Sequence, residues 1–238
     1  MASTPRDNEA FYREVDEELR RDQLTKSWQR HGKLIIAAVV LALAALAGVI
    51  YWQNRRQEIA GQRGETLSEA LRQIQSGDTK AAAPKLNELA ANGGPGYRAT
   101  ALLAKANVAM QAGDEKSALA ALTTLSEDQS IAEPFRQLAL IRRTAMEFDK
   151  LPAAQVISRL QPLAMAGSAW FGSAGEMVAL AHLKLGQPKQ AAPIFAALAR
   201  DETVPSSIRT RAVQMASSLG VDATPTAGKP AQVKEVNE

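Results

Sequence analysis

Residues 99–125 read ATALLAKANVAMQAGDEKSALAALTTL, which is two runs rich in Ala and Leu on either side of Gly113-Asp114. Ala and Leu are strong helix formers, and Gly adopts the left-handed conformation that ends many helices. The stretch therefore predicts two helices joined by a tight turn, a helical hairpin.

The same pattern recurs along the chain. Turn glycines stand at Gly77, Gly113 and Gly186, so the second lies 36 residues after the first and the third lies 73 residues after the second, about twice that interval. Six offsets from the glycine carry matching residue types: Ala seven before, Ile, Met or Leu three before, Lys three after, Ala five after, Leu or Phe nine after and Leu twelve after. The residues are Ala70, Ala106, Ala179; Ile74, Met110, Leu183; Lys80, Lys116, Lys189; Ala82, Ala118, Ala191; Leu86, Leu122, Phe195; and Leu89, Leu125, Leu198.

A fixed period of this length is typical of stacked helix hairpins, because one hairpin cannot bury its own apolar face. Ala at the crossing points lets two helices approach closely, and the larger apolar positions fill the hairpin core. A less regular unit has Leu151 near its turn and Leu160 and Leu163 nine and twelve residues later, without the glycine, so we expect a differently shaped turn there. We expect helix pairs near 57–76/79–92, 97–112/115–125, 134–148/152–165 and 169–185/188–200, with a last helix near 205–219.

Composition agrees with an all-α fold. The 238 residues include 45 Ala but only 11 aromatics, and no alternating β-branched or aromatic run dominates any segment. The fold class that we predict is all-α, with one N-terminal transmembrane helix followed by an α-solenoid of degenerate helix hairpins.

The membrane segment is the run from Leu34 to Trp52, LIIAAVVLALAALAGVIYW, 19 residues without a charge. As a helix it spans roughly 28 Å, close to the hydrocarbon thickness of a bilayer. Trp28, Tyr51 and Trp52 supply interfacial aromatics, and basic residues flank both ends. A buried helix of a soluble protein and a cleaved signal peptide are the competing interpretations.

Charge sets the expected orientation. Six bases precede the span within about 20 residues and four follow it, so the N-terminus is expected in the cytoplasm and the repeats outside. The expected domains are a charged tail at 1–33 with an amphipathic helix (Phe11, Val15, Leu19), the span at 34–52, a repeat domain at 53–220 and a disordered tail at 221–238.

Motifs for catalysis or cofactors are missing from the sequence. There is no Cys, the two His stand far apart at His31 and His182, and Gly93–Gly96 lacks the GK[ST] ending of a phosphate loop. The net charge of +3 comes from a mixed surface without the basic cluster that nucleic acid requires. We therefore expect no enzyme activity, cofactor, metal, nucleic acid or small-molecule substrate.

Protein binding is the better hypothesis, because stacked hairpins form a concave surface. Aromatic residues dominate binding hot spots, so Tyr97, Trp170 and Phe171 are the candidate partner-binding residues. The alternative is that these rings fill the core.

A period near 36 with small residues and Gly at these places resembles the tetratricopeptide repeat, although most of its expected first-helix aromatics are missing. The tail FYREVDEELRRDQLTKSWQRHGK, the span closed by Tyr51-Trp52 and the repeats together resemble the bacterial ancillary SecYEG translocon subunit family, called YfgM-like, from about Phe11 to Gly220. The resemblance implies an inner-membrane protein with a periplasmic repeat domain. Its implied partners are the SecYEG channel, a membrane-anchored periplasmic chaperone of the prolyl-isomerase type and nascent polypeptides.

The leading hypothesis is thus a non-enzymatic accessory of the Sec export channel that binds chaperone or emerging chains through its repeats. The alternative is a membrane-anchored scaffold for cell-envelope or cell-division assembly, with the same topology and different clients.

Overall fold

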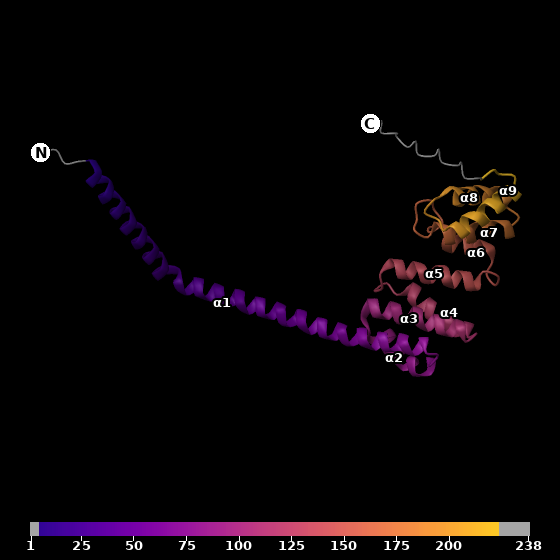
Figure 1. Ribbon diagram of the computed structural model, residues 1–238, viewed down its shortest axis with the longest axis horizontal. Helices are drawn as coiled ribbons and strands as arrows, with labels where there is room; N and C mark the ends of the chain where they lie inside the picture. Colours follow the sequence, from indigo (N-terminus) through magenta and orange to yellow (C-terminus); the bar gives the residue numbers. More distant parts are fainter. Residues whose placement is uncertain (1–4, 224–238) are drawn as a thin grey trace, which may run out of the picture. The chain divides into compact units, whose positions relative to one another are not determined.

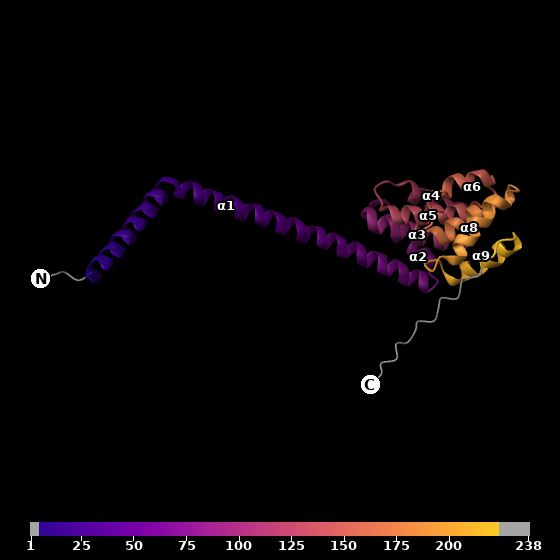
Figure 2. The ribbon, with the colours of Figure 1, turned by 90° about the horizontal axis from the view of Figure 1, so that it is seen from above.

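The computed structural model describes the backbone of residues 5–223 and the side chains of residues 32–34 and 36–223. Every regular element in this part of the chain is an α-helix, which confirms the predicted class (Figures 1 and 2). The helices are α1 (Pro5–Gln75), α2 (Thr79–Asn92), α3 (Gly94–Gln111), α4 (Glu115–Glu127), α5 (Glu133–Glu147), α6 (Ala153–Leu160), α7 (Phe171–Lys184), α8 (Pro188–Arg200) and α9 (Ser206–Ser218).

Helix α1 continues without a break from the apolar segment into the first hairpin, so the expected helix start near residue 57 is wrong. No Pro or Gly stands between Trp52 and Gln57, and Arg55 forms an ion pair with Glu58 one turn later at 2.9 Å. The chain divides into two compact units, residues 1–62 and 63–238, and α1 contributes residues to both.

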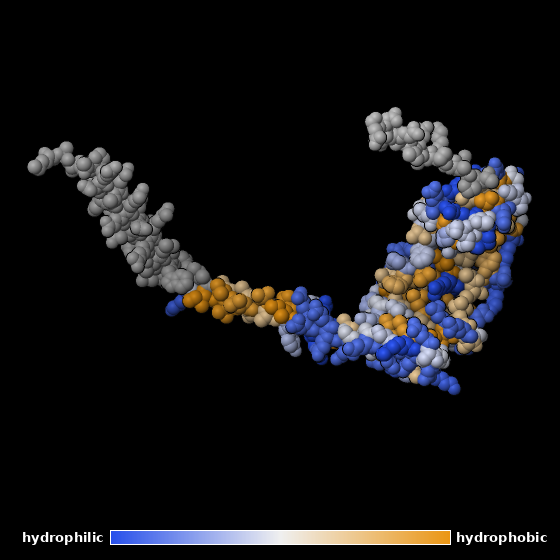
Figure 3. All heavy atoms as spheres, viewed as in Figure 1, coloured by the Kyte–Doolittle hydropathy of each residue, from blue (hydrophilic) through white to orange (hydrophobic). Residues whose placement is uncertain are grey.

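The apolar segment of α1 exposes its large side chains, visible as the orange length of helix in Figure 3. An 18-residue window here has a mean hydropathy of 2.8 and none of it is buried. Among the described residues this helix alone is long and apolar enough to cross a membrane, judged by length and composition. The segment therefore fits a single-pass membrane protein.

The repeat helices stack as pairs, α3 on α4 and α7 on α8, with α9 packed on α8 (Figures 1 and 2). The predicted ranges 79–92 and 188–200 are confirmed to the residue. Helix α6 is shorter than expected and ends at Leu160. Pro162 explains this end, because proline lacks the N–H that would continue the helix.

The glycine turns have the predicted role. Gly77, Gly113 and Gly186 have φ angles of 84°, 73° and 68°, where a Cβ would be strained. After the first two, Asp78 and Asp114 cap the next helix, accepting hydrogen bonds from the Ala81 and Ser117 amides at 3.0 Å. The turn after α5 has no positive φ and instead closes with Leu151 N–H donating to Glu147 O at 2.9 Å, a different shape as expected.

The crossing-point and core positions are confirmed by burial. The six alanines at the matched offsets are at most 1% exposed, and the Leu and Phe residues nine and twelve after the glycine are at most 2% exposed. Ile74 and Leu183, three before the glycine, are half-buried. Met110 is the exception, because 48% of its surface is exposed and it does not fill the hairpin core as predicted. Residues 224–238 of the expected disordered tail, and the side chains of Phe11, Val15 and Leu19, lie outside the described residues.

Candidate partner-binding face

Polar contacts link the first helices of successive hairpins. Arg142 Nη1 of α5 donates to Asn107 Oδ1 of α3 at 3.1 Å, and Arg211 of α9 donates from Nε and Nη2 to Glu176 Oε1 and Oε2 of α7 at 2.7 and 2.8 Å. Both pairs are 35 residues apart, close to the repeat period. These contacts show which surfaces of the first helices adjoin one another.

We use the name first-helix face for the residues that share a helix face with these contacts at spacings of three, four or seven. Their burial ranges from half-buried to exposed. The face comprises Thr100, Leu103, Asn107 and Met110 of α3, Phe135, Leu138, Arg142 and Ala145 of α5, Ser173, Glu176 and Leu180 of α7, and Ser207, Arg211 and Gln214 of α9. It mixes apolar groups with polar and charged ones.

Glu176 and Arg211 form the strongest polar contact on this face. The bidentate hydrogen bonds to Glu176, and its negative charge, raise the pKa of the Arg211 guanidinium above its usual value. Glu176 is more buried than Arg211, with side-chain exposures of 20% and 53%. The pair joins α9 to α7 by a bidentate, charge-assisted contact.

Trp170 lies between two hairpins. Its indole Nε1 donates to Gln137 Oε1 of α5 at 2.6 Å, and its ring packs against the core cluster that contains Ile141, Val156 and Val178. The side chain is half-buried, so one part of the ring supports the fold and the rest is exposed.

Tyr97 is also half-buried but lies in a different place. It packs on the first hairpin core, and a Cβ added at Gly64 would lie 3.2 Å from its hydroxyl oxygen. The missing side chain at Gly64 thus lets α1 approach the ring of Tyr97 at the start of α3.

Phe171 is buried, with 4% of its surface exposed. It belongs to the core of the last hairpin, where a Cβ added at Gly175 would lie 3.0 Å from its ring. Although Trp170 and Phe171 are neighbours in sequence, they pack into different clusters. The three candidate aromatics therefore do not form one surface, and the ring of Phe171 fills core space in this conformation.

The predicted span ends are both exposed, Leu34 by 69% and Trp52 by 55%. The guanidinium carbon of Arg56 lies 3.5 Å from the centroid of the Trp52 ring, a cation–π contact. An aromatic ring beside a cation is a typical residue pair for the interface between lipid and water.

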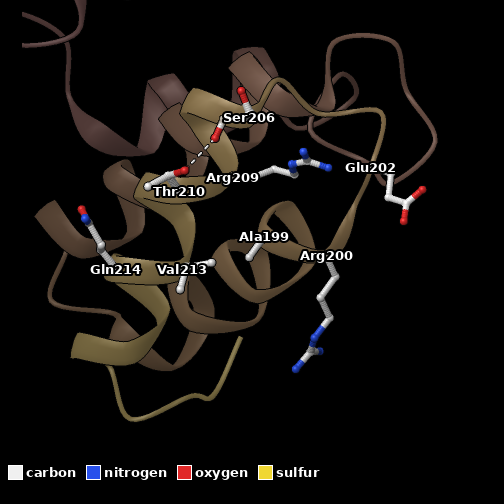
Figure 4. Close-up of a pocket in the computed structure, with 8 residues that line it drawn as sticks. All are labelled: Ala199, Arg200, Glu202, Ser206, Arg209, Thr210, Val213 and Gln214. Atoms are coloured by element: carbon white, nitrogen blue, oxygen red, sulfur yellow. Dashed lines mark hydrogen bonds between the residues drawn. The ribbon is translucent and has the colours of Figure 1, made fainter. Parts of the chain in front are cut away.

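A polar groove of about 690 Å³ lies between the end of α8 and α9 (Figure 4). Arg200 and Glu202 line one side, and Arg209, Thr210, Val213 and Gln214 of α9 line the other. Thr210 Oγ1 donates to the Ser206 carbonyl at 2.9 Å, so this hydroxyl is already used within the helix.

No group of three His, Asp or Glu side chains positioned to hold a metal occurs among the residues described. His182 is half-buried, with Nδ1 2.8 Å from Gln187 Oε1, as expected for a packed helix residue. Three Asp carboxylates accept hydrogen bonds within turns. Hydrogen bonds from Ser117, Ser130 and Thr203 lower the pKa of Asp114, Asp128 and Asp201 respectively.

The sequence predicts the aromatic and repeat positions but not the polar contacts between hairpins. Their only signal in the sequence is a polar residue followed by a complementary one about one repeat period later, as with Glu176 and Arg211. Such pairs are frequent by chance in a chain with 53 charged residues.

A protein-family model described as a tetratricopeptide repeat-like domain matches residues 26–197. Among curated proteins, an ancillary SecYEG translocon subunit of Haemophilus influenzae is 28% identical over 134 residues, which is 56% of this chain and 65% of that protein. The chain thus matches slightly less than two thirds of the length of that relative. No solved structure matches the chain.

Proposed function

The chain belongs to the tetratricopeptide repeat-like domain family, and from this premise we propose that it is a non-enzymatic, membrane-anchored accessory subunit of the Sec protein-export channel. The similarity to an ancillary SecYEG translocon subunit carries the proposal. It is supported by the exposed apolar helix, which runs directly into a stack of repeat hairpins.

The topology that we propose has residues 1–33 in the cytoplasm, residues 34–52 in the inner membrane, residues 53–220 in the periplasm and residues 221–238 as a tail. The excess of bases before the span supports this orientation. A C-terminal alkaline phosphatase fusion should be active and a C-terminal green fluorescent protein fusion dark. The reverse result would place the repeats in the cytoplasm and remove the basis for a periplasmic role.

The partners that we propose are the SecYEG channel, through the span, and a membrane-anchored periplasmic prolyl-isomerase-type chaperone or emerging polypeptides, through the first-helix face. The mixed apolar and charged residues of that face support peptide or protein binding. Tyr97 and the exposed part of Trp170 are proposed contacts at its edges.

Photo-crosslinking in cells tests these assignments. A crosslinker at Leu43 in the span should give SecYEG subunits, and one at Ser173 on the first-helix face should give a chaperone or a nascent chain. A crosslinker at Ala120, exposed on the second helix α4, is the matched control and should give neither. Recovery of envelope-assembly or cell-division proteins instead, with no SecYEG subunit, would favour the scaffold alternative.

A further inference from the structure

The turn that ends α9 repeats the turn that ends the first helix of three earlier hairpins. Gly220 has a φ of 80°, and Val221 N–H donates to Ala216 O at 3.0 Å. The equivalent bonds run from Asp78 to Gln73, from Asp114 to Ala109 and from Gln187 to His182, at 2.8, 2.8 and 2.9 Å. Helix α9 is thus built as the first helix of a fifth hairpin.

The sequence after Gly220 does not repeat the pattern of a second helix. Residues 221–223 are not helical. Five, nine and twelve residues after Gly220, where earlier hairpins have Ala, Leu or Phe, and Leu, the sequence has Pro225, Lys229 and Gln232. Residues directly after the turn therefore lack the apolar pattern of a second helix.

Comparison with α3 identifies the surface of α9 that the second helix of a fifth hairpin would cover. In α3, the residues 14, 11 and 7 before the glycine are Ala99, Leu102 and Ala106, which are at most 5% exposed in a core shared with Leu122 and Leu125 of α4. The equivalent residues of α9 are Ser206, Arg209 and Val213, and all three line the polar groove of Figure 4.

A second groove, of about 670 Å³, lies beside α8 and is lined by Pro188, Lys189, Ala192, Pro193, Ala196, Ala197, Arg200, Leu219 and Val221. It shares Arg200 with the polar groove. An equivalent groove beside α2 and α3, where α4 does follow the turn, measures about 250 Å³. Five of its lining residues stand at the same offsets from their glycines, namely Thr79, Ala83, Asn87, Ala112 and Asp114.

Charge indicates the kind of helix that fits. Lys189, Arg200 and Arg209 line the two grooves, and Glu202 is the one carboxylate among the lining residues. Apart from Lys189 and Arg200, the residues that line the groove beside α8 are apolar. A helix with a face of small and branched apolar residues and with acidic residues at its flanks matches both grooves.

We propose that the open end of the repeat stack docks an acidic amphipathic α-helix of a partner protein, which takes the position of the missing second helix of the fifth hairpin. This inference does not depend on which partners the first-helix face binds. It assigns a helix-binding site to the end of the stack.

The probe is a fluorescent peptide with the sequence of residues 114–128, DEKSALAALTTLSED, an acidic second helix taken from this chain. Fluorescence anisotropy against the full-length protein in detergent should show saturable binding. Pro193→Glu should weaken it at least tenfold, because the new carboxylate enters the groove and repels the peptide. Pro193 is exposed, so the variant should fold.

Pro84→Glu is the matched control. Both prolines lie seven residues after a turn glycine, both are exposed inside a second helix, and only Pro193 lines the large groove. The control should bind within twofold of the unsubstituted protein. Arg209→Glu should also weaken binding, and a peptide with Lys in place of its acidic residues should bind that variant better than the original peptide does.

Absence of saturable binding to the unsubstituted protein, or equal loss in the two proline variants, would overturn the proposal. A photo-crosslinker at Ala197 distinguishes other occupants in the full chain. An internal crosslink to residues 224–238 would show that the chain's own tail fills the groove. A crosslinked dimer would show that a second copy does, and either result overturns the proposal.

Discussion

Replacement of Gly113 by Ala tests whether the repeat turn depends on backbone conformation alone. Gly113 has a φ of 73°, and an added Cβ would meet no atom within 4 Å. The substitution therefore introduces no clash and removes no contact. Its cost is the strain of a left-handed Ala, about 1–2 kcal/mol.

Gly96 supplies the control. It lies in the first turn of α3 without a positive φ, and its added Cβ would also meet nothing within 4 Å. Ala at this position should stabilise α3 by about 0.5–1 kcal/mol, since Gly loses more backbone freedom on folding. The two substitutions are chemically identical and should have opposite signs.

Hydrogen exchange of the α3 and α4 amides measures the difference. Gly113→Ala should speed exchange about five- to thirtyfold and Gly96→Ala should slow it about two- to fivefold, if exchange follows the opening equilibrium. Equal effects of the two substitutions, or unchanged exchange in Gly113→Ala, would refute the conclusion that the turn requires Gly113 for its left-handed backbone conformation.

Three further predictions concern the repeat domain. Leu122→Ala, at a position that is 0% exposed, should lower the free energy of unfolding by about 2–5 kcal/mol in chemical denaturation; a loss below 1 kcal/mol would contradict its place in the core. Glu176→Gln should destabilise α9 by about 0.5–1 kcal/mol at low salt, and the difference should shrink in high salt; a salt-independent loss in hydrogen exchange would argue against an ion pair. The pKa of Asp128 is held below 3.8 by hydrogen bonds from Ser130 and by the charges of Arg98 and Arg136. Its stabilisation should therefore be complete above about pH 4 and disappear as pH falls through the lowered pKa, so Asp128→Asn should reduce Tm at pH 7 but not at the lowest pH.

Much of the fold follows from the period of small residues in the sequence. The crossing alanines and the buried Leu and Phe positions repeat because each hairpin uses the same close approach, so Ala118 and Leu122 were predictable without coordinates. The third hairpin was less predictable, because Pro162 and a turn without glycine replace the regular pattern. The continuity of α1 was not predicted, although the stretch between Trp52 and Gln57 contains no Pro or Gly that would end a helix.

The candidate site was harder to predict. Aromatic residues served as a guide to binding, yet Phe171 belongs to the core and Tyr97 and Trp170 lie in separate clusters. Which side of an aromatic ring is buried depends on neighbouring hairpins and not on its own segment. Likewise, no apolar pattern after Gly220 marks it as a repeat turn in the sequence, and its φ angle and hydrogen bonds identify it as the fourth such turn.

The polar contacts between first helices have a mechanical consequence. The pairs Asn107–Arg142, Asp149–Lys184 and Glu176–Arg211 each join one hairpin to the next through exposed hydrogen bonds. Water can replace such exposed contacts at little cost in free energy, whereas separating the buried leucines costs much more. Neighbouring hairpins can therefore move slightly against each other while the apolar cores stay packed. The stiffness of the stack should then depend on ionic strength.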